Sequence, residues 1–290
     1  MERLIYTNAL GQAVIFDESG LLRWLEVDDL GGLEADFMTS TGPFQDGATS
    51  VGDAYFTAKA IKVKFAVVSS ELDIAIRSLN SILNPKLGLG KLTYERGGKS
   101  YVLNKVKTRS MPTLPGSPSR GMSYQITSAV FEAFDPYYTD EDYLEASVST
   151  GENCLEFPVN IFDSFVFDFT NTTGILVTNG GDVDCPVTVI LDGPKNSPLT
   201  VENLDTGEKI VLAMSLLETE RLTITTGIDD INVIKEDLIT GISTVAFQYI
   251  DVAETSFFRL PRGTSTLLIT AGEAEVEQAT IKYKQRWVGI

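Results

Sequence analysis

The sequence predicts a mainly β protein with two domains and a single helix. Alternation of apolar and polar residues recurs along most of the chain, as expected of half-buried strands. Only one segment has an apolar stripe of helical period, and turn residues punctuate the second half at short intervals. The length of 290 residues suits two domains of ordinary size, which we assign to residues 1–140 and 141–290.

A strand is predicted over residues 58–68, and the helix follows it over residues 72–83. Residues 58–68 alternate Ile, Val and Phe with lysine, which is the pattern of a half-buried strand. Residues 72–83 then carry apolar side chains three and four residues apart. Ser70 and Asp73 have the spacing of a capping box, with Asp in place of the usual Glu or Gln. A strand followed by an amphipathic helix is therefore expected.

A hairpin completes the centre of the N-terminal domain. The helix is expected to end before Pro85, because a residue preceding proline is disfavoured in the α region. Gly97 and Gly98 then lie between two strand patterns, where paired glycines suit a tight primed turn. We therefore predict a β-sandwich-like domain with one amphipathic helix and a hairpin. Further short strands are expected at residues 4–7, 13–17 and 21–27.

The second half is predicted as an antiparallel sandwich of jelly-roll type. Many short strand patterns follow one another, separated by Gly, Asn, Asp and Pro, and no convincing helix interrupts them. In the last pattern Ile281, Tyr283 and Trp287 share a face, which favours a core position for the tryptophan over a sugar platform. The expected strands are residues 155–162, 165–170, 186–192, 199–203, 209–213, 221–225, 231–235, 256–260, 265–270 and 280–288.

The charge of the chain is unevenly distributed. The net charge is −17, of which residues 1–140 contribute −2 and residues 141–290 contribute −15. Residues 59–109 are locally basic, with 11 Lys and Arg against 3 Asp and Glu. Because their lysines alternate with core positions, we interpret them as solvated strand faces or a contact with an acidic neighbour. No specific nucleic-acid partner is predicted.

Several kinds of chemistry are excluded or disfavoured by composition. The chain has no histidine, which excludes Ser/His and Cys/His hydrolases and makes a zinc site improbable. Cys154 and Cys185 lack metal-type or redox-type spacing, and we predict two buried thiols, a disulfide being the alternative. No apolar run approaches the roughly 20 residues of a membrane span, and no N-terminal signal pattern is present. Synthesis in a cytoplasm without membrane insertion is therefore expected.

No catalytic, cofactor or metal site is predicted. The segment Gly88–Lys91 resembles part of a phosphate loop, but the first glycine and the Ser or Thr of that motif are missing. Carboxylates at two-residue spacing, as at Glu218 and Glu220, are interpreted as a solvated face in so acidic a chain. Asp182 and Asp184 could hold calcium, but too few ligands lie nearby. We therefore predict that the protein is not an enzyme.

Four segments of the sequence resemble a known family. The run NPKLGLGKLTYERGGKSYVLNKV, followed by Phe134-Asp135-Pro136-Tyr137-Tyr138, resembles the distal tail protein (Dit) of siphophages. The resemblance extends to FFRLPRG at residues 257–263 and to the closing YKQRWVGI. It implies an N-terminal ring-forming tail domain and a galectin-like C-terminal sandwich.

The resemblance also implies a function and partners. The family forms a ring, commonly a hexamer, at the tip of the phage tail, where it joins the tail tube to a lysin, fibre or receptor-binding protein. Residues 31–55, rich in Gly, Ser, Thr and Asp, are our candidate for an arm that reaches a neighbouring subunit, a mobile surface loop being the alternative. The candidate inter-subunit residues are Phe37, Phe44, Lys62, Lys64, Lys105 and Lys107. The expected location is the virion tail tip.

Two other functions stay open on the sequence alone. A galectin-like sandwich could bind a host-surface saccharide, although fold alone does not confer sugar binding. A glycan hydrolase with two carboxylates needs no histidine, but no feature of the sequence favours one. Both alternatives are ranked below the tail hub.

Overall fold

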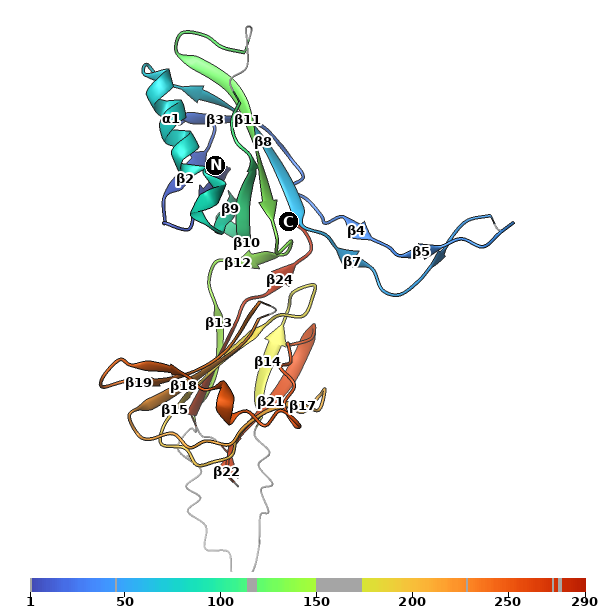
Figure 1. The fold of residues 1–290 in the computed structure, drawn as a ribbon, viewed down its shortest axis with the longest axis vertical. Coiled ribbons are helices and arrows are strands. Elements are labelled where there is room, and N and C mark those ends of the chain that lie inside the picture. Colours follow the sequence, from blue (N-terminus) through green and yellow to red (C-terminus); the bar gives the residue numbers. More distant parts are fainter. Residues whose placement is uncertain are drawn as a thin grey trace, which may run out of the picture. The chain divides into compact units, whose positions relative to one another are not determined.

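The computed structural model describes residues 2–44, 46–113, 119–149, 174–227, 229–272, 274–275 and 278–290. The chain forms two compact units, of which unit 1 is Met1–Glu141 together with Arg286–Ile290, and unit 2 is Asp142–Gln285. In the described residues strands dominate and α1 (Leu72–Ile82) is the one α-helix (Figure 1). The predicted mainly β class is confirmed. The return of residues 286–290 to unit 1 was not expected from any pattern in the sequence.

Unit 1 is built on a nine-stranded antiparallel sheet. The strand order is β2-β1-β9-β10-β11-β8-β3, with β12 added to β10 and β24 added to β12. The amide of Asp17 donates to the carbonyl of Leu22 at 3.1 Å and the amide of Trp24 donates to Asp17 at 2.8 Å, so the outer strands β2 and β3 meet. The strands are β1 (Arg3–Thr7), β2 (Ala13–Phe16), β3 (Leu22–Asp28), β8 (Lys59–Val68), β9 (Gly90–Arg96), β10 (Lys99–Ser110), β11 (Tyr124–Ala133), β12 (Tyr138–Asp140) and β24 (Arg286–Trp287).

The core of unit 1 follows the predicted alternation of β8. Ile61, Val63, Phe65 and Val67 of this strand are at most 1% exposed, and α1 contributes buried apolar residues to the same core. The capping-box prediction was wrong: the helix begins after Glu71, one residue later than the motif requires, and no side chain caps it. The predicted helix end is confirmed, because a short 3₁₀ turn starts at Pro85. Gly97 and Gly98 have φ of 58° and 81°, as the predicted primed turn requires.

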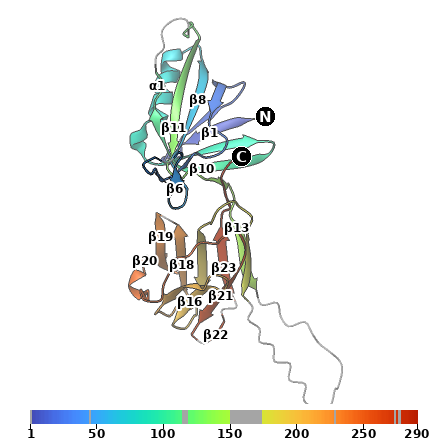
Figure 2. The same ribbon diagram turned by 90° about the vertical axis from the view of Figure 1, so that its right-hand side faces the viewer.

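Unit 2 consists of two antiparallel sheets that share one apolar core (Figure 2). The six-stranded sheet has the order β13-β23-β15-β18-β19-β20, and the five-stranded sheet has β14-β21-β16-β17 with β22 on β21. The predicted antiparallel arrangement is confirmed. The strands are β13 (Leu144–Ser149), β14 (Ile175–Asn179), β15 (Val187–Asp192), β16 (Leu199–Asn203), β17 (Glu208–Leu212), β18 (Glu220–Gly227), β19 (Asp230–Asp237), β20 (Ser243–Val245), β21 (Gly263–Ala271), β22 (Ala274–Glu275) and β23 (Gln278–Tyr283).

Some expected strands of unit 2 differ from the structure. Residues 256–260 form no strand and keep a single bridge, from Leu260 to the buried Cys185. The expected strand at 280–288 ends at Tyr283, and Trp287 packs against the core of unit 1 instead. The strands expected at 155–162 and 165–170, and Cys154, lie outside the described residues.

A partly buried ion pair stabilises the start of β18 in unit 2. The carboxylate of Glu220 accepts a hydrogen bond from the amide of Leu217 at 2.9 Å and another from Lys235 Nζ at 2.7 Å. The Leu217 amide and then Lys235 lower the pKa of Glu220 below its usual 4.5, because both stabilise the charged form. The pair therefore stabilises unit 2 above pH 4.5, and this contribution is lost as pH falls through the lowered folded value.

Replacing Glu220 by Gln tests this linkage. At neutral pH we expect the variant to lose about 1–2 kcal/mol of unfolding free energy in urea, because a charged hydrogen bond is replaced by a neutral one. The difference from the wild type should vanish below the lowered pKa of Glu220. Glu218→Gln, a change at an exposed neighbour, is the control. If the unfolding free energies of the variant and the wild type differ by the same amount in acid, the stabilisation does not come from the charged form of Glu220.

The arm and its root, a candidate functional site

Residues 31–58, called the arm below, leave the sheet between β3 and β8 as a narrow ribbon (Figure 1). β4 (Ala35–Asp36) pairs with β7 (Tyr55–Phe56), and farther along the ribbon β5 (Thr39–Ser40) pairs with β6 (Thr49–Ser50). The Tyr55 hydroxyl donates to Asp36 Oδ2 at 3.1 Å, and this carboxylate raises the pKa of Tyr55. The irregular segment of the sequence is therefore an ordered two-stranded extension.

The arm exposes large apolar side chains along its length. Every described residue from 36 to 55 is exposed, which leaves the arm without a core of its own. Phe44 lies at the tip with a φ of 63°, in the left-handed region that bulky residues rarely adopt. Folded monomers seldom present such a series of apolar side chains unless another molecule covers them. The exposed residues are Phe37, Met38, Phe44, Val51 and Tyr55.

A buried lysine holds the start of the arm. Lys59 is 6% exposed, and its ammonium group donates to the carbonyls of Gly31 and Gly32, both at 2.9 Å. The same group lies 5.6 Å from the centre of the Tyr138 ring. Burial lowers the pKa of Lys59 below its usual 10.5, although Asp29 raises it. Two carbonyls and an aromatic face thus replace the water that a lysine usually keeps.

Tyr138 fixes a third carbonyl next to the first two. Its hydroxyl donates to the carbonyl of Leu30 at 2.7 Å, and its ring is 1% exposed. Burial raises the pKa of Tyr138 well above its usual value, so the hydroxyl remains a donor at any physiological pH. Three consecutive carbonyls, from Leu30 to Gly32, are therefore bound by Lys59 and Tyr138. This defines the direction in which the arm leaves the sheet.

Residues 286–290 complete the root of the arm. Arg286 forms an ion pair with Asp135 and lies over the Tyr137 ring, with its guanidinium carbon 4.2 Å from the ring centre. Tyr137 in turn meets Phe56 of the arm edge to face, at 5.9 Å between ring centres. β24 pairs with β12, which brings Arg286 opposite Thr139. We call Lys59, Tyr137, Tyr138 and Arg286 the root.

The candidate residues from the sequence fall into two separate groups. Phe37 and Phe44 lie on the arm, whereas the four candidate lysines lie on the sheet. Lys62 and Lys64 pair across the strands with Asp28 at 3.9 Å and Glu26 at 3.4 Å. The structure does not bring the two groups together as one surface.

The other two candidate lysines also have neighbours within the chain. Lys107 stands opposite Glu132 on β11. Lys105 has a φ of 55°, where the pairing of β10 with β9 shifts register. Acidic residues of β3 and β11 therefore face part of the basic segment at residues 59–109. A charge reversal at Lys62 or Lys64 would set an acid against an acid, so it would test monomer stability as well as assembly.

The root was not identified from the sequence, although one signal was present. Lys59 lies on the same face of β8 as Ile61, Val63 and the other buried residues, so a lysine occupies a position where an apolar residue is expected. The acceptors Gly31 and Gly32 are almost thirty residues away in sequence and cannot be inferred from it. Tyr138 and Arg286 each belong to a segment that resembles the family, but the resemblance does not indicate a role for either residue.

Comparison with known proteins identifies part of the chain. Residues 180–287 match the family model described as siphovirus-type tail component, C-terminal domain. This part of the chain is therefore similar in sequence to the siphovirus-type tail component domain. A search of curated proteins gave no match.

The tail component fold extends over the whole chain. The crystal structure of the Dit protein of phage SPP1 matches with a TM-score of 0.69 and 12% identity, covering 99% of both chains. A chain of the phage p2 baseplate in its activated conformation matches with TM-scores of 0.59 in strontium and 0.58 in calcium. Identities there are 13% and 14%, and each match covers 98% of both chains. The prediction of the Dit fold is confirmed, and the family match of residues 180–287 supports the prediction of a phage tail component.

Proposed function

We propose that this tail component is a ring-forming hub at the distal end of a siphophage tail. The observation that carries the proposal is the arm, which exposes apolar side chains over its length while the root holds its base rigidly. The solved SPP1 Dit protein of the same fold is described as a hub of the adsorption apparatus in phages that infect Gram-positive bacteria. Fold and exposed arm together support a hub made of several copies of this chain.

In this proposal unit 1 builds the ring. A closed ring needs heterologous contacts, in which one surface of a subunit meets a different surface of the next. The arm supplies the first of these surfaces, with Phe37, Met38 and Phe44 as the groups that become buried. A preorganised arm loses little conformational entropy on docking, because the root has already fixed its base. We propose a hexameric ring at the virion tail tip, built without enzymatic activity.

The wider partners follow from the position of a hub. We propose that the ring meets the tail tube on one side and a lysin, fibre or receptor-binding protein on the other. A saccharide-binding role has less support, because Trp24 and Trp287, the two tryptophans of the chain, both pack against the core of unit 1. No described helix has the length and apolarity needed to cross a membrane.

The mass of the protein in solution tests the proposal. Light scattering across a concentration series, with negative-stain images, should give a ring of about six times the chain mass. Phe37→Ser combined with Phe44→Ser should shift the population to monomers, because both side chains lose their apolar contact in the ring. Met122→Ser, at a fully exposed methionine of the same unit outside the arm, should leave the ring intact. A ring that survives the double change would remove the arm from the interface.

A further inference from the structure

A second exposed apolar surface lies on unit 2, around the turn from β19 to β20. Leu217, Leu238, Ile239, Ile242 and Val245 are between 47% and 78% exposed. Their exposure does not come from a loose turn, because Asp237 Oδ1 accepts hydrogen bonds from the amides of residues 239 and 240 at 2.8 and 3.3 Å. These bonds also lower the pKa of Asp237. The apolar side chains are thus held outward on an ordered turn.

The backbone of β20 is open on its outer side. β20 is the terminal strand of the six-stranded sheet and pairs only with β19 among the described strands. The amide of Asp237 donates to Ile242 at 3.0 Å and the amide of Ala246 donates to Val233 at 2.8 Å. In an antiparallel ladder this directs the polar groups of Thr244 inward and those of Ser243 and Val245 outward. In the described part of the chain no backbone hydrogen bond reaches these outward groups.

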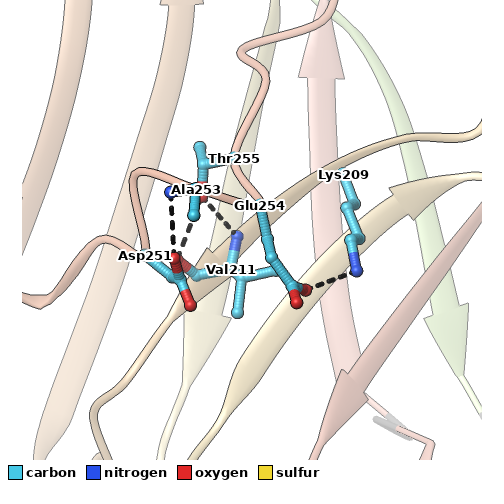
Figure 3. A network of polar contacts seen from close by, with 6 residues as sticks. All are labelled: Lys209, Val211, Asp251, Ala253, Glu254 and Thr255. Carbon is cyan, nitrogen blue, oxygen red and sulfur yellow. Dashed lines mark hydrogen bonds and ion pairs between the residues drawn. The ribbon is translucent and has the colours of Figure 1, made fainter.

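In the five-stranded sheet of the same unit, the backbone of the edge strand β17 is hydrogen-bonded by a neighbouring segment of the chain. Along β17 the carbonyl of Lys209 accepts from the amide of Ser256 at 2.7 Å, and the carbonyl of Val211 accepts from Asp251 at 2.9 Å. The amide of Val211 donates to Thr255 Oγ1 at 3.0 Å, and Lys209 forms an ion pair with Glu254 at 2.6 Å (Figure 3). This edge is closed by the chain itself. Exposed edges are usually protected in this way, so an open one with apolar neighbours indicates a partner.

Charge indicates what kind of partner fits. Residues 142–285 contain 8 basic and 23 acidic side chains. The basic groups nearest the turn are already paired, Lys235 with Glu220 and Arg221 with Asp192. A second copy of unit 2 would bring two strongly acidic surfaces together, whereas a basic segment would be attracted.

We propose that β20 receives an extended segment of another protein, which adds to the sheet as a further strand. Its alternate residues are Val, Ile or Leu, which lie on the same face of the sheet as Val245, and Lys or Arg flank them. Strand addition draws affinity from main-chain hydrogen bonds and specificity from alternate side chains. The surface belongs to unit 2 and is independent of the ring contact proposed for the arm.

Binding of a peptide to the full-length protein tests this inference. The labelled probe is the peptide KVTVRVTVK, whose valines share one face, followed by fluorescence polarisation. We expect saturable binding that weakens as salt is added, since the attraction is partly electrostatic. The same peptide N-methylated on alternate residues should not bind, because it lacks the amides of one edge. Absence of saturable binding by the unmodified peptide would overturn the proposal.

Variants of the edge locate the peptide. Val245→Pro removes an outward amide without touching the bonds from β20 to β19, and should weaken binding about tenfold. Val245→Ser, which keeps the amide but removes the apolar side chain, should also weaken binding, whereas Leu176→Ser, at an exposed residue of β14, should have no effect. Unfolding curves establish that each variant is folded. If Val245→Pro leaves peptide affinity unchanged, or instead lowers the mass of the protein in solution, the assignment to a basic strand is wrong.

Discussion

Removal of residues 37–54 of the arm should abolish the proposed ring and leave the fold of unit 1 intact. Asp36 and Tyr55 stand directly opposite each other in the arm, so residues 37–54 can be replaced by a two-residue Asn-Gly turn. All described residues that this removes are exposed, and the core of unit 1 loses no contact. We expect a monomer by light scattering with a melting temperature within a few degrees of the wild type.

The control for the arm excision is the shortening of an exposed turn in unit 2. Replacing residues 238–241 at the β19–β20 turn by Asn-Gly alters unit 2 and should leave the mass of the ring unchanged. A ring of normal mass after arm excision would show that the copies meet through the sheet alone. A monomer that has also lost its cooperative melting would mean that the arm serves the fold, and the ring contact would need another explanation.

Loss of Arg286 should destabilise unit 1 more than any other single change at the root. The side chain of Arg286 is 7% exposed and that of Asp135 is 25% exposed, so Arg286→Met leaves a largely buried carboxylate without its cation. Breaking such a pair typically costs about 3–5 kcal/mol. The stacking of Arg286 on Tyr137 is lost as well. We therefore expect the urea midpoint of unit 1 to fall strongly.

The two tryptophans make this effect measurable for unit 1 by itself. Trp24 and Trp287 both pack against the core of unit 1, so tryptophan fluorescence follows that unit, while circular dichroism follows both. Asp135→Asn combined with Arg286→Met should recover part of the loss, because no buried charge remains. The pair from Arg3 to Glu95 provides the matched control, because Arg3 is 47% exposed where Arg286 is 7% exposed, and Arg3→Met should change the midpoint little. Equal effects of Arg286→Met and Arg3→Met would contradict the role of the root.

The strands and cores were largely predictable because they depend on local alternation. β8, the helix stripe and the glycine turn each follow from side-chain period or backbone freedom within a dozen residues. The antiparallel strands of unit 2 were recognised for the same reason. The capping box was missed because a helix start that differs by one residue changes which side chain can reach the first amides.

The candidate site was only half predictable. The exposed phenylalanines of the arm could be singled out as scattered apolar residues in a polar segment. The lysines of β8 could not be judged, because their partners Glu26 and Asp28 depend on which strand lies beside β8. Arg286 and Asp135 are separated by 151 residues, and no local pattern connects them. Long-range pairing therefore decides which charges remain available for contact.

The pairing of β12 with β24 has a further consequence for the architecture. Tyr138 stands opposite Trp287 and Thr139 opposite Arg286, so the two strands form a hairpin of unit 1. All of unit 2 then occupies the position of the hairpin loop. An insertion whose two ends are adjacent can be exchanged or shortened without redrawing the host sheet. Unit 2 could thus be exchanged or shortened while the sheet and the arm of unit 1 stay the same.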